Sequence, residues 1–267
     1  MRALLLIGLW LWGGSACAAA QPDPFPQVAA AYLVELDGKP LWARQPDRRL
    51  PQASLTKLMT VLLALEQGRM DDVVTIGNSA ARETGSLLHL KAGQQFRLHD
   101  LLAAAMLPSA NDACHALADH LAGNQAAFVA RMNRRAALLG LHDTHFVNAC
   151  GHDSPGHYSS AHDLALLAHA VLHHPAVPDL SAQAHLTIST VDGNTHFQLD
   201  NKNALIGRYP GALGLKTGYT LQAGKCLVAY AKRDTHEVLL VMLHGKDRWW
   251  DSADMLDLAF DHARIAH

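Results

Sequence analysis

Three short motifs contain the residue types of a serine nucleophile and its substrate clamp. They are Ser54-Leu-Thr-Lys57, Ser109-Ala-Asn111 and Lys216-Thr217-Gly218, in this order along a chain of 267 residues. The first two motifs are each expected about 0.33 times by chance in such a composition, and the third about 0.02 times. A serine hydroxyl becomes a useful nucleophile when a neighbouring base takes its proton. The three motifs together therefore predict a serine activated by a lysine.

The spacing of Ser54 and Lys57 suits a helix, because residues three apart share a helix face. Lysine is a base near neutral pH only if desolvation and a second cation lower its pKa, and we expect Lys216 to be that cation. The apolar run 58–65 predicts a buried helix with Ser54 in its first turn. There the unpaired Ser54 N–H suits one half of an oxyanion hole. The alternative is a serine N-cap on an ordinary core helix.

The second motif follows Pro108, which predicts a turn between the apolar run 101–107 and the segment 114–121. A Ser109 hydroxyl in this turn can pass a proton between a base and a leaving group. The Asn111 side chain can hold a substrate amide through its donor and acceptor ends. The alternative is a turn in which both side chains only cap the backbone.

The third motif ends the stretch 211–215 and precedes two strand-like runs, so we place it on a strand that faces the site. Lys216 and Thr217 would bind a substrate carboxylate. Gly218 would remove the side chain that stops an extended peptide from lying along the strand edge. An exposed turn is the alternative.

Periodicity and turn residues predict the elements that position these motifs. We expect a hairpin around Asp37-Gly38, formed by strands at 28–36 and 40–44. Three later strands are expected at 213–220, 225–231 and 237–243. Three helices are expected at 126–139, 162–173 and 252–263. We expect the rest to be mainly helical. A sheet built from both chain ends, with a helical insertion that carries Ser109, gives one α+β domain of two lobes with a cleft between them.

Composition indicates an exported single domain. The chain is 49% hydrophobic and 17% charged, and its net charge of −2 argues against nucleic acid as a partner. Arg2, the apolar run 4–12 and the small residues that follow predict a signal peptide over 1–20. Lipidation of Cys17 is a minor alternative. We expect residues 21–267 to form one domain, with no C-terminal β domain and no stable membrane anchor.

The remaining cysteines are Cys114, Cys150 and Cys226, an odd number of which at most one pair can form. We expect no disulfide framework and small buried side chains instead. Histidine is abundant at 18 residues, but the chain has neither His-x-His nor His-Glu-x-x-His. The segment 156–163, with His157, superficially resembles zinc D-Ala-D-Ala peptidases, with a spacing one residue short. We therefore expect no metal and no cofactor.

Beyond the three motifs, the chain resembles the serine D-alanyl-D-alanine carboxypeptidases, the low-molecular-mass penicillin-binding proteins. The resemblance covers nearly all of the chain after the signal peptide, and its further segments are 53–60, 146–148, 156–161, 163–165, 214–220 and 223–226. It implies a β-lactamase/transpeptidase-like fold. In that fold a five-stranded antiparallel sheet is flanked by helices, and the active site lies in the cleft beside a helical lobe.

The resemblance also implies a role for each matching residue. Ser54 would be the acylated nucleophile, Lys57 its base and Ser109 the proton relay. The substrate-binding residues would be Asn111, which holds an amide, Lys216 and Thr217, which bind the carboxylate, and Gly218 beside them. The Tyr219 N–H would complete the oxyanion hole with the Ser54 N–H, and Arg248 would also bind substrate. Arg248 matches a position where arginine assists carboxylate binding, although the motif around it is loose. A surface arginine before the last helix is its alternative.

The implied activity is removal of the terminal D-Ala from peptidoglycan stem peptides outside the cytoplasmic membrane, with β-lactams as covalent inhibitors. A D,D-endopeptidase that cleaves cross-links is the alternative within the family. A β-lactamase of this motif set needs a glutamate between the second and third motifs to activate water. Residues 109–216 contain no glutamate, so we expect a long-lived penicillin adduct. An inactive wall-binding relative would not need the intact serine and lysines.

Overall fold

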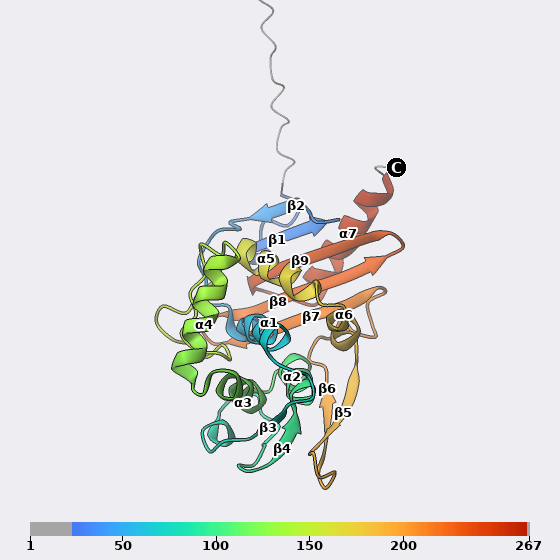
Figure 1. Cartoon of the computed structure of the whole chain (residues 1–267). Coiled ribbons are helices and arrows are strands. Elements are labelled where there is room, and N and C mark those ends of the chain that lie inside the picture. The colour runs from blue at the N-terminus through green and yellow to red at the C-terminus, as the bar shows by residue number, and fades with distance from the viewer. Residues whose placement is uncertain (1–22, 266–267) are drawn as a thin grey trace, which may run out of the picture.

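A five-stranded antiparallel sheet forms the centre of the molecule (Figure 1). The structure is a computed structural model, and it describes residues 23–265; the predicted signal peptide lies outside these residues. The sheet order is β2-β1-β9-β8-β7, so the first strands of the chain pair with the last ones. Its strands are β1 (Ala29–Leu36), β2 (Lys39–Arg44), β7 (Ala212–Thr220), β8 (Gly224–Arg233) and β9 (His236–Gly245).

Alternation of side chains along β1 gives the sheet two apolar faces. Tyr32 and Val34 join the core cluster that contains Phe260 of α7 (Trp250–Ile265). Ala31 and Leu33 join the larger cluster on the other face. There the sheet is covered by α1 (Lys57–Gln67), α5 (Ala161–Leu172) and α6 (Ala176–Ser181). A sheet packed on both faces explains why its central strands read as nearly continuous apolar runs.

A helical lobe extends beyond α1 (Figure 1). It contains α2 (Leu98–Met106), α3 (Asn111–Ala122) and α4 (Gln125–Leu138), with the short turn η2 (Ala80–Arg82) and the hairpin of β3 (Val73–Thr75) and β4 (Gln95–Arg97). The first eight residues of α1 are all buried, so this helix lies in the core between the lobe and the sheet. The lobe and the sheet therefore share one apolar cluster.

The structure confirms the predicted fold class, the five predicted strands and the three predicted helices, with ends that differ by a few residues. The expectation that the rest is mainly helical was wrong at two hairpins. Strands β3 and β4 have three residues each, too few for a period-two pattern. The hairpin of β5 (His185–Ser189) and β6 (His196–Asp200) did carry that alternation, around a turn at Gly193 with φ +72°.

Cys114 of α3 and Cys150 form a disulfide, with their Cα atoms 5.9 Å apart. The expectation of unpaired cysteines was therefore wrong. An odd number of cysteines permits one pair, and only the fold brings these two residues, separated by 36 positions, together. Cys226 is a buried free thiol, and burial raises its pKa to about 11.

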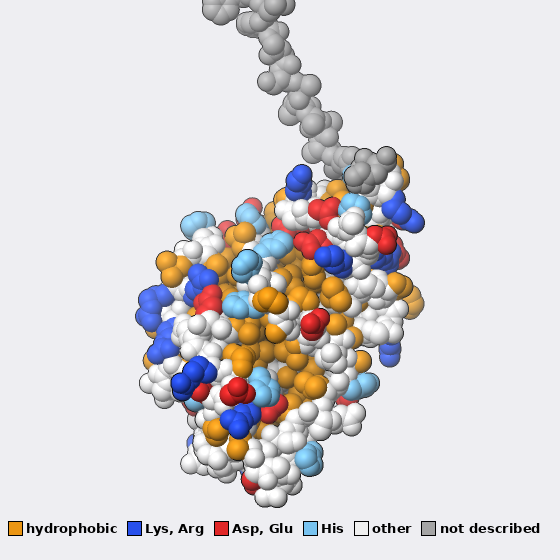
Figure 2. All heavy atoms as spheres, turned by 45° about the vertical axis from the view of Figure 1, so that its right-hand side comes forward, with side chains coloured by type: hydrophobic (Ala, Val, Ile, Leu, Met, Phe, Trp, Pro, Cys, Tyr) orange, Lys and Arg blue, Asp and Glu red, His pale blue; other side chains and the backbone are white. Residues whose placement is uncertain are grey.

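No helix within residues 23–265 combines the length and the apolarity that crossing a bilayer requires. Figure 2 shows hydrophobic side chains gathered in the middle of one face, with charged side chains and histidines around them. An apolar pocket of about 250 Å³ lies between α1, α2, α6 and β5.

Candidate active site

Ser54 and Lys57 lie side by side at the start of α1. The Lys57 ammonium donates a hydrogen bond to the Ser54 hydroxyl, with nitrogen and oxygen 3.1 Å apart. Ser54 sits in a separate 3₁₀ turn, η1 (Ala53–Thr56), and α1 begins at Lys57, so the predicted helix starts slightly later than expected. Ala53 has a φ of +49°, a conformation that non-glycine residues seldom adopt and that the surroundings must impose.

Lys57 is fully buried, and carbonyl groups from two other segments hold its ammonium. The Lys57 Nζ donates to Asn111 Oδ1 at 2.7 Å and to the backbone oxygen of Cys150 at 2.6 Å. Burial, with a smaller effect of the Lys202 ammonium, lowers the pKa of Lys57 to about 7; Glu83 acts in the opposite direction. A lysine with this pKa is about half deprotonated at pH 7 and can therefore act as a base there.

Asn111 is the first residue of α3, and both ends of its side chain are engaged within the protein. Besides accepting from Lys57, it donates from Nδ2 to the Thr84 carbonyl at 2.5 Å. Asn111 therefore orients the lysine, which sequence reasoning did not foresee, while the expected substrate-amide contact stays a prediction. Ser109 precedes α3 with a φ of +62° and is nearly buried. Its hydroxyl has no hydrogen-bond partner within residues 23–265.

Lys216 lies on β7 and is buried beside the site. Its ammonium donates to the Thr217 carbonyl at 3.1 Å. Burial holds the pKa of Lys216 well below its usual range, with further lowering by Lys57, Lys202 and Arg248. Lys202 is the cation that lowers the pKa of Lys57, whereas the repulsion between Lys57 and Lys216 lowers the pKa of Lys216.

The backbone at Gly218 and at Gly151 packs closely against the residues around Ser54. A Cβ at Gly218 would lie 3.0 Å from the Gln52 carbonyl oxygen and 3.2 Å from the Ser54 backbone nitrogen. The missing side chain thus lets β7 approach η1, whereas we had expected it to make room for a peptide. A Cβ at Gly151, whose φ is +91°, would lie 2.1 Å from the Ala53 carbonyl oxygen. Both glycines are needed for close backbone approach.

Most predicted residues meet in one open pocket of about 290 Å³, which is lined by Ser54, Ser86, Ser109, Lys202, Thr217, Gly218, Tyr219 and Arg248. Tyr219 is largely exposed at its rim. Arg248 donates to the Gly218 carbonyl at 2.8 Å and stacks on the Trp249 ring, which fixes its guanidinium at the strand. Ser86 and Lys202 were missed by sequence reasoning; Lys202 donates to the Ser86 hydroxyl at 2.5 Å. No spacing motif links these two residues to the others.

Several histidines form hydrogen bonds with residues around the site. His157 accepts from the Val147 N–H at 2.9 Å and contacts the Thr56 hydroxyl at 2.8 Å; this hydroxyl in turn donates to the Ala53 carbonyl. Burial lowers the pKa of His157 to about 4, so it is neutral and fixes the turn before α1. Glu83 accepts from His115 at 2.5 Å and pairs with His152 at 3.0 Å.

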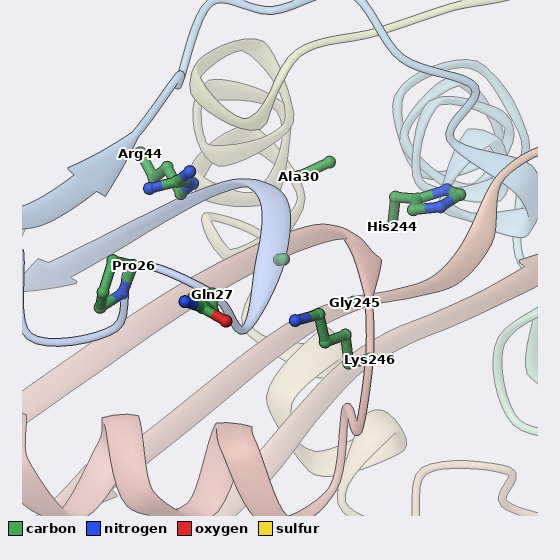
Figure 3. A pocket seen from close by; sticks show the side chains of 8 residues that line it. Pro26, Gln27, Ala30, Arg44, His244, Gly245 and Lys246 are labelled. Atoms are coloured by element: carbon green, nitrogen blue, oxygen red, sulfur yellow. The ribbon is translucent and has the colours of Figure 1, made fainter.

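The surroundings show no other centre for this chemistry. Within residues 23–265 there is no cluster of three or more His, Cys, Asp or Glu residues placed to hold a metal ion. A larger cavity of about 740 Å³ lies at the ends of β1 and β9, lined in part by Arg44, His244 and Lys246 (Figure 3). It is shallow and contains no nucleophile, so we place the site at the smaller pocket around Ser54.

Comparison with known proteins agrees with this geometry. At 36% identity over 277 residues, the chain is similar to the D-alanyl-D-alanine carboxypeptidase DacF of Bacillus subtilis, covering 97% of this chain and 70% of DacF. It is 31% identical to DacB2 of Mycobacterium tuberculosis, covering 90% and 84% of the two chains. It spans 57% of the longer DacA of Escherichia coli.

Solved structures show the same fold. The crystal structure of a D-alanyl-D-alanine carboxypeptidase from Mycobacterium tuberculosis has a TM-score of 0.84 at 30% identity, over 91% of this chain and 95% of that one. A Streptomyces DD-transpeptidase has a TM-score of 0.82 at 28% identity, over 88% and 98% of the two chains. The sequence profile described as D-alanyl-D-alanine carboxypeptidase matches residues 17–247. The chain belongs to the D-alanyl-D-alanine carboxypeptidase family.

Proposed function

We propose that this protein removes the terminal D-Ala from peptidoglycan stem peptides through an acyl-enzyme on Ser54. The observation that carries the proposal is the 3.1 Å contact between the Ser54 hydroxyl and Lys57, whose burial brings its pKa to about 7. Neutral Lys57 takes the hydroxyl proton as Ser54 Oγ attacks the penultimate D-Ala carbonyl carbon. The backbone N–H groups of Ser54 and Tyr219 stabilise the oxyanion.

Ser109 completes the transfer. When the C–N bond breaks, the leaving amine takes a proton from Lys57 through the Ser109 hydroxyl, which has no partner within residues 23–265 and lines the pocket. Water then attacks the ester and releases the shortened peptide, and the proton returns to Ser54. A φ of +62° is uncommon for a non-glycine residue, and such conformations are often kept at functional sites.

The cations beside the pocket favour a substrate with a free carboxylate. Lys202, Lys216 and Arg248 make no ion pair with any described carboxylate, and burial lowers the pKa of each. An anionic group bound among them would relieve this desolvation by direct charge pairing. A terminal D-Ala carboxylate satisfies that requirement. In a cross-link, the scissile bond is followed by a neighbouring stem peptide and not by a free terminal D-Ala. We therefore favour carboxypeptidase over endopeptidase activity.

Two further proposals concern the compartment and inhibitors. The Cys114–Cys150 disulfide suits an oxidising compartment, which supports export and a periplasmic or extracytoplasmic location. β-Lactams should acylate Ser54, and the resulting acyl-enzyme should be hydrolysed slowly. Residues 109–216 contain no glutamate, and the upstream Glu83 is occupied by His115 and His152, so no free carboxylate is available from these to activate water.

The test combines two substrates with one inhibitor. Uncross-linked pentapeptide muropeptides should release D-Ala, and cross-linked muropeptides should be cleaved more slowly; the reverse preference would make the protein an endopeptidase. Benzylpenicillin should add its mass to the intact protein, and Ser54→Ala should abolish both reactions. Turnover of penicillin at tens per second without an adduct would identify a β-lactamase instead. Activity retained by Ser54→Ala would contradict the acyl-enzyme proposal altogether.

A further inference from the structure

Two of the groups that hold the Lys57 ammonium belong to segments joined by the disulfide. The Lys57 ammonium donates to Oδ1 of Asn111 at 2.7 Å; Asn111 is the first residue of α3, and Cys114 lies one turn further along this helix. The Lys57 ammonium also donates at 2.6 Å to the backbone carbonyl of Cys150, the residue that carries the second sulfur. The covalent link therefore joins the two acceptors on either side of the lysine.

The segment that contains Cys150 is a compact turn. The Asn148 side-chain oxygen accepts hydrogen bonds from the backbone N–H groups of Cys150, Gly151 and His152 at 3.2, 2.7 and 3.0 Å. The same turn places Gly151 against the backbone before Ser54. A shift of this turn as a unit would thus move the Cys150 carbonyl and disturb the nucleophile together.

Three contacts attach this turn to its surroundings near Lys57. The Thr60 hydroxyl of α1 donates to the Ala149 carbonyl at 2.7 Å, His152 pairs with Glu83 at 3.0 Å, and the disulfide links Cys150 to α3. The disulfide is the only one of the three that is covalent and that acts at the residue whose carbonyl binds Lys57. Both of its cysteines are buried, so the link lies in the protein interior, as the Lys57 side chain does.

We propose that the Cys114–Cys150 disulfide is a positioning element of the catalytic site, which holds Asn111 Oδ1 and the Cys150 carbonyl on Lys57 and keeps water away from the lysine. The proposal rests on the proposed function of Ser54 and Lys57. It adds that acylation depends on the redox state of this pair. Reduction by a dithiol transfers two electrons and two protons to the sulfurs, gives two thiols, and leaves the reductant as its own disulfide.

The expected effect follows from loss of the covalent tether. Without the disulfide, α3 and the Cys150 turn are held together by packing and hydrogen bonds alone, so the two acceptors of the Lys57 ammonium can move relative to each other. A misplacement of about 1 Å near reacting groups can cost on the order of 10²-fold in rate. Admitting water beside Lys57 also relieves its desolvation, which raises its pKa from about 7 toward the ordinary value of 10.5.

The test measures acylation by benzylpenicillin across pH 5–9 for the oxidised protein, the protein reduced with dithiothreitol, and Cys114→Ser/Cys150→Ser. We expect the acylation rate at pH 7 to fall about 10- to 100-fold, and the acid limb of the profile to move to higher pH. The KM for a pentapeptide should rise less than the acylation rate falls, because the carboxylate-binding residues Lys216 and Thr217 lie on β7, which the disulfide does not link. Reoxidation should restore the rate, and non-reducing peptide mapping should show the linked pair.

A destabilised control separates positioning from general loss of stability. Phe260→Leu weakens the core on the other face of the sheet and should lower the melting temperature without moving the pH profile. A reduced protein that stays folded and acylates at the oxidised rate, with the same acid limb, would overturn the proposal. Failure of the Ser54 proposal is a different result, since Ser54→Ala would then remain active whatever the state of the disulfide.

Discussion

The Lys57 ammonium nitrogen lies 3.1 Å from the Ser54 hydroxyl oxygen, and its other two hydrogen bonds go to the carbonyl oxygens of Asn111 and Cys150. A carboxylate partner would stabilise the charged lysine and raise its pKa. Neutral acceptors orient the ammonium and leave burial as the dominant influence on its pKa, which falls to about 7. The arrangement keeps the lysine both fixed in place and able to give up its proton.

Acylation should therefore depend on pH through Lys57. Below pH 7 the lysine is increasingly protonated and cannot accept the Ser54 proton, so the rate of acylation by benzylpenicillin should fall about tenfold per pH unit well below that value. Stopped-flow or quenched-flow measurements from pH 5 to 9 check this. Lys57→Arg, which stays protonated throughout, should lose about 10²- to 10⁴-fold at pH 8. A flat profile in the wild type would exclude Lys57 as the base.

Lys202 should influence both the base and the substrate. Its ammonium lowers the pKa of Lys57 and lines the pocket, so Lys202→Met should move the acid limb of acylation to higher pH and raise the KM of a pentapeptide. Lys225→Met is the matched control, because this exposed lysine only donates to the Lys246 carbonyl. Equal behaviour of the two variants would assign Lys202 no role in the site.

A methyl group at Gly218 should disturb the nucleophile. The added Cβ would press on the Gln52 carbonyl and on the Ser54 backbone nitrogen, which cannot retreat without moving η1. We expect Gly218→Ala to lower kcat/KM by on the order of 10²-fold. Gly77→Ala is the control, since its Cβ would meet only the Ser79 hydroxyl at 3.6 Å. Wild-type kinetics for Gly218→Ala would show that β7 can withdraw freely from η1.

The Glu83–His115 pair should make stability depend on pH. Hydrogen bonds from His115 and His152 outweigh burial and lower the pKa of Glu83, so its contribution is present above about pH 4.5 and is lost as the pH falls further. Glu83 raises the pKa of His115. The stabilising contribution of protonated His115 is therefore complete below about pH 6.5 and is lost as the pH rises through the raised pKa. The pair should therefore stabilise the fold most between these two values.

Urea unfolding of the wild type and Glu83→Gln across pH 4–9 measures this dependence. The difference in unfolding free energy should be largest near pH 5–6 and should narrow at alkaline pH. Glu66→Gln is the control, because the Arg135 partner of Glu66 does not titrate in this range. A difference for Glu83→Gln that stays constant up to pH 9 would contradict a contribution from His115 protonation.

The sequence predicted those parts of the site that depend on local spacing. Ser54 and Lys57 are three residues apart, and Lys216 to Gly218 follow one another on a strand, so their placement required little more than the element type. The central strands were predictable because long apolar runs between turn residues leave few alternatives. Very short strands such as β3 carry too little pattern for this reasoning.

The contacts that refine the site depend on tertiary structure and were not predictable in this way. Lys202 reaches the pocket from the segment after β6, and His157 supports the turn before α1 from more than a hundred residues away. The partner choice of Cys114 and Cys150 likewise follows from how α3 packs beside the turn at Asn148. Sequence spacing does not predict such long-range contacts, because they depend on how whole helices and strands pack together.

The pairing of β1 with β9 has a consequence for how the molecule is assembled. Ala29 lies opposite Gly245, so β1 can pair with β2 early but meets β9, its other neighbour, only after the chain has been made as far as Gly245. The hydroxyl of Ser54 is likewise made early, while the strand that approaches it, β7, comes late. Such a topology has a high contact order and should fold slowly, after synthesis and not during it. Until β7 arrives, the first two motifs lack the third, and the chain has no functioning catalyst.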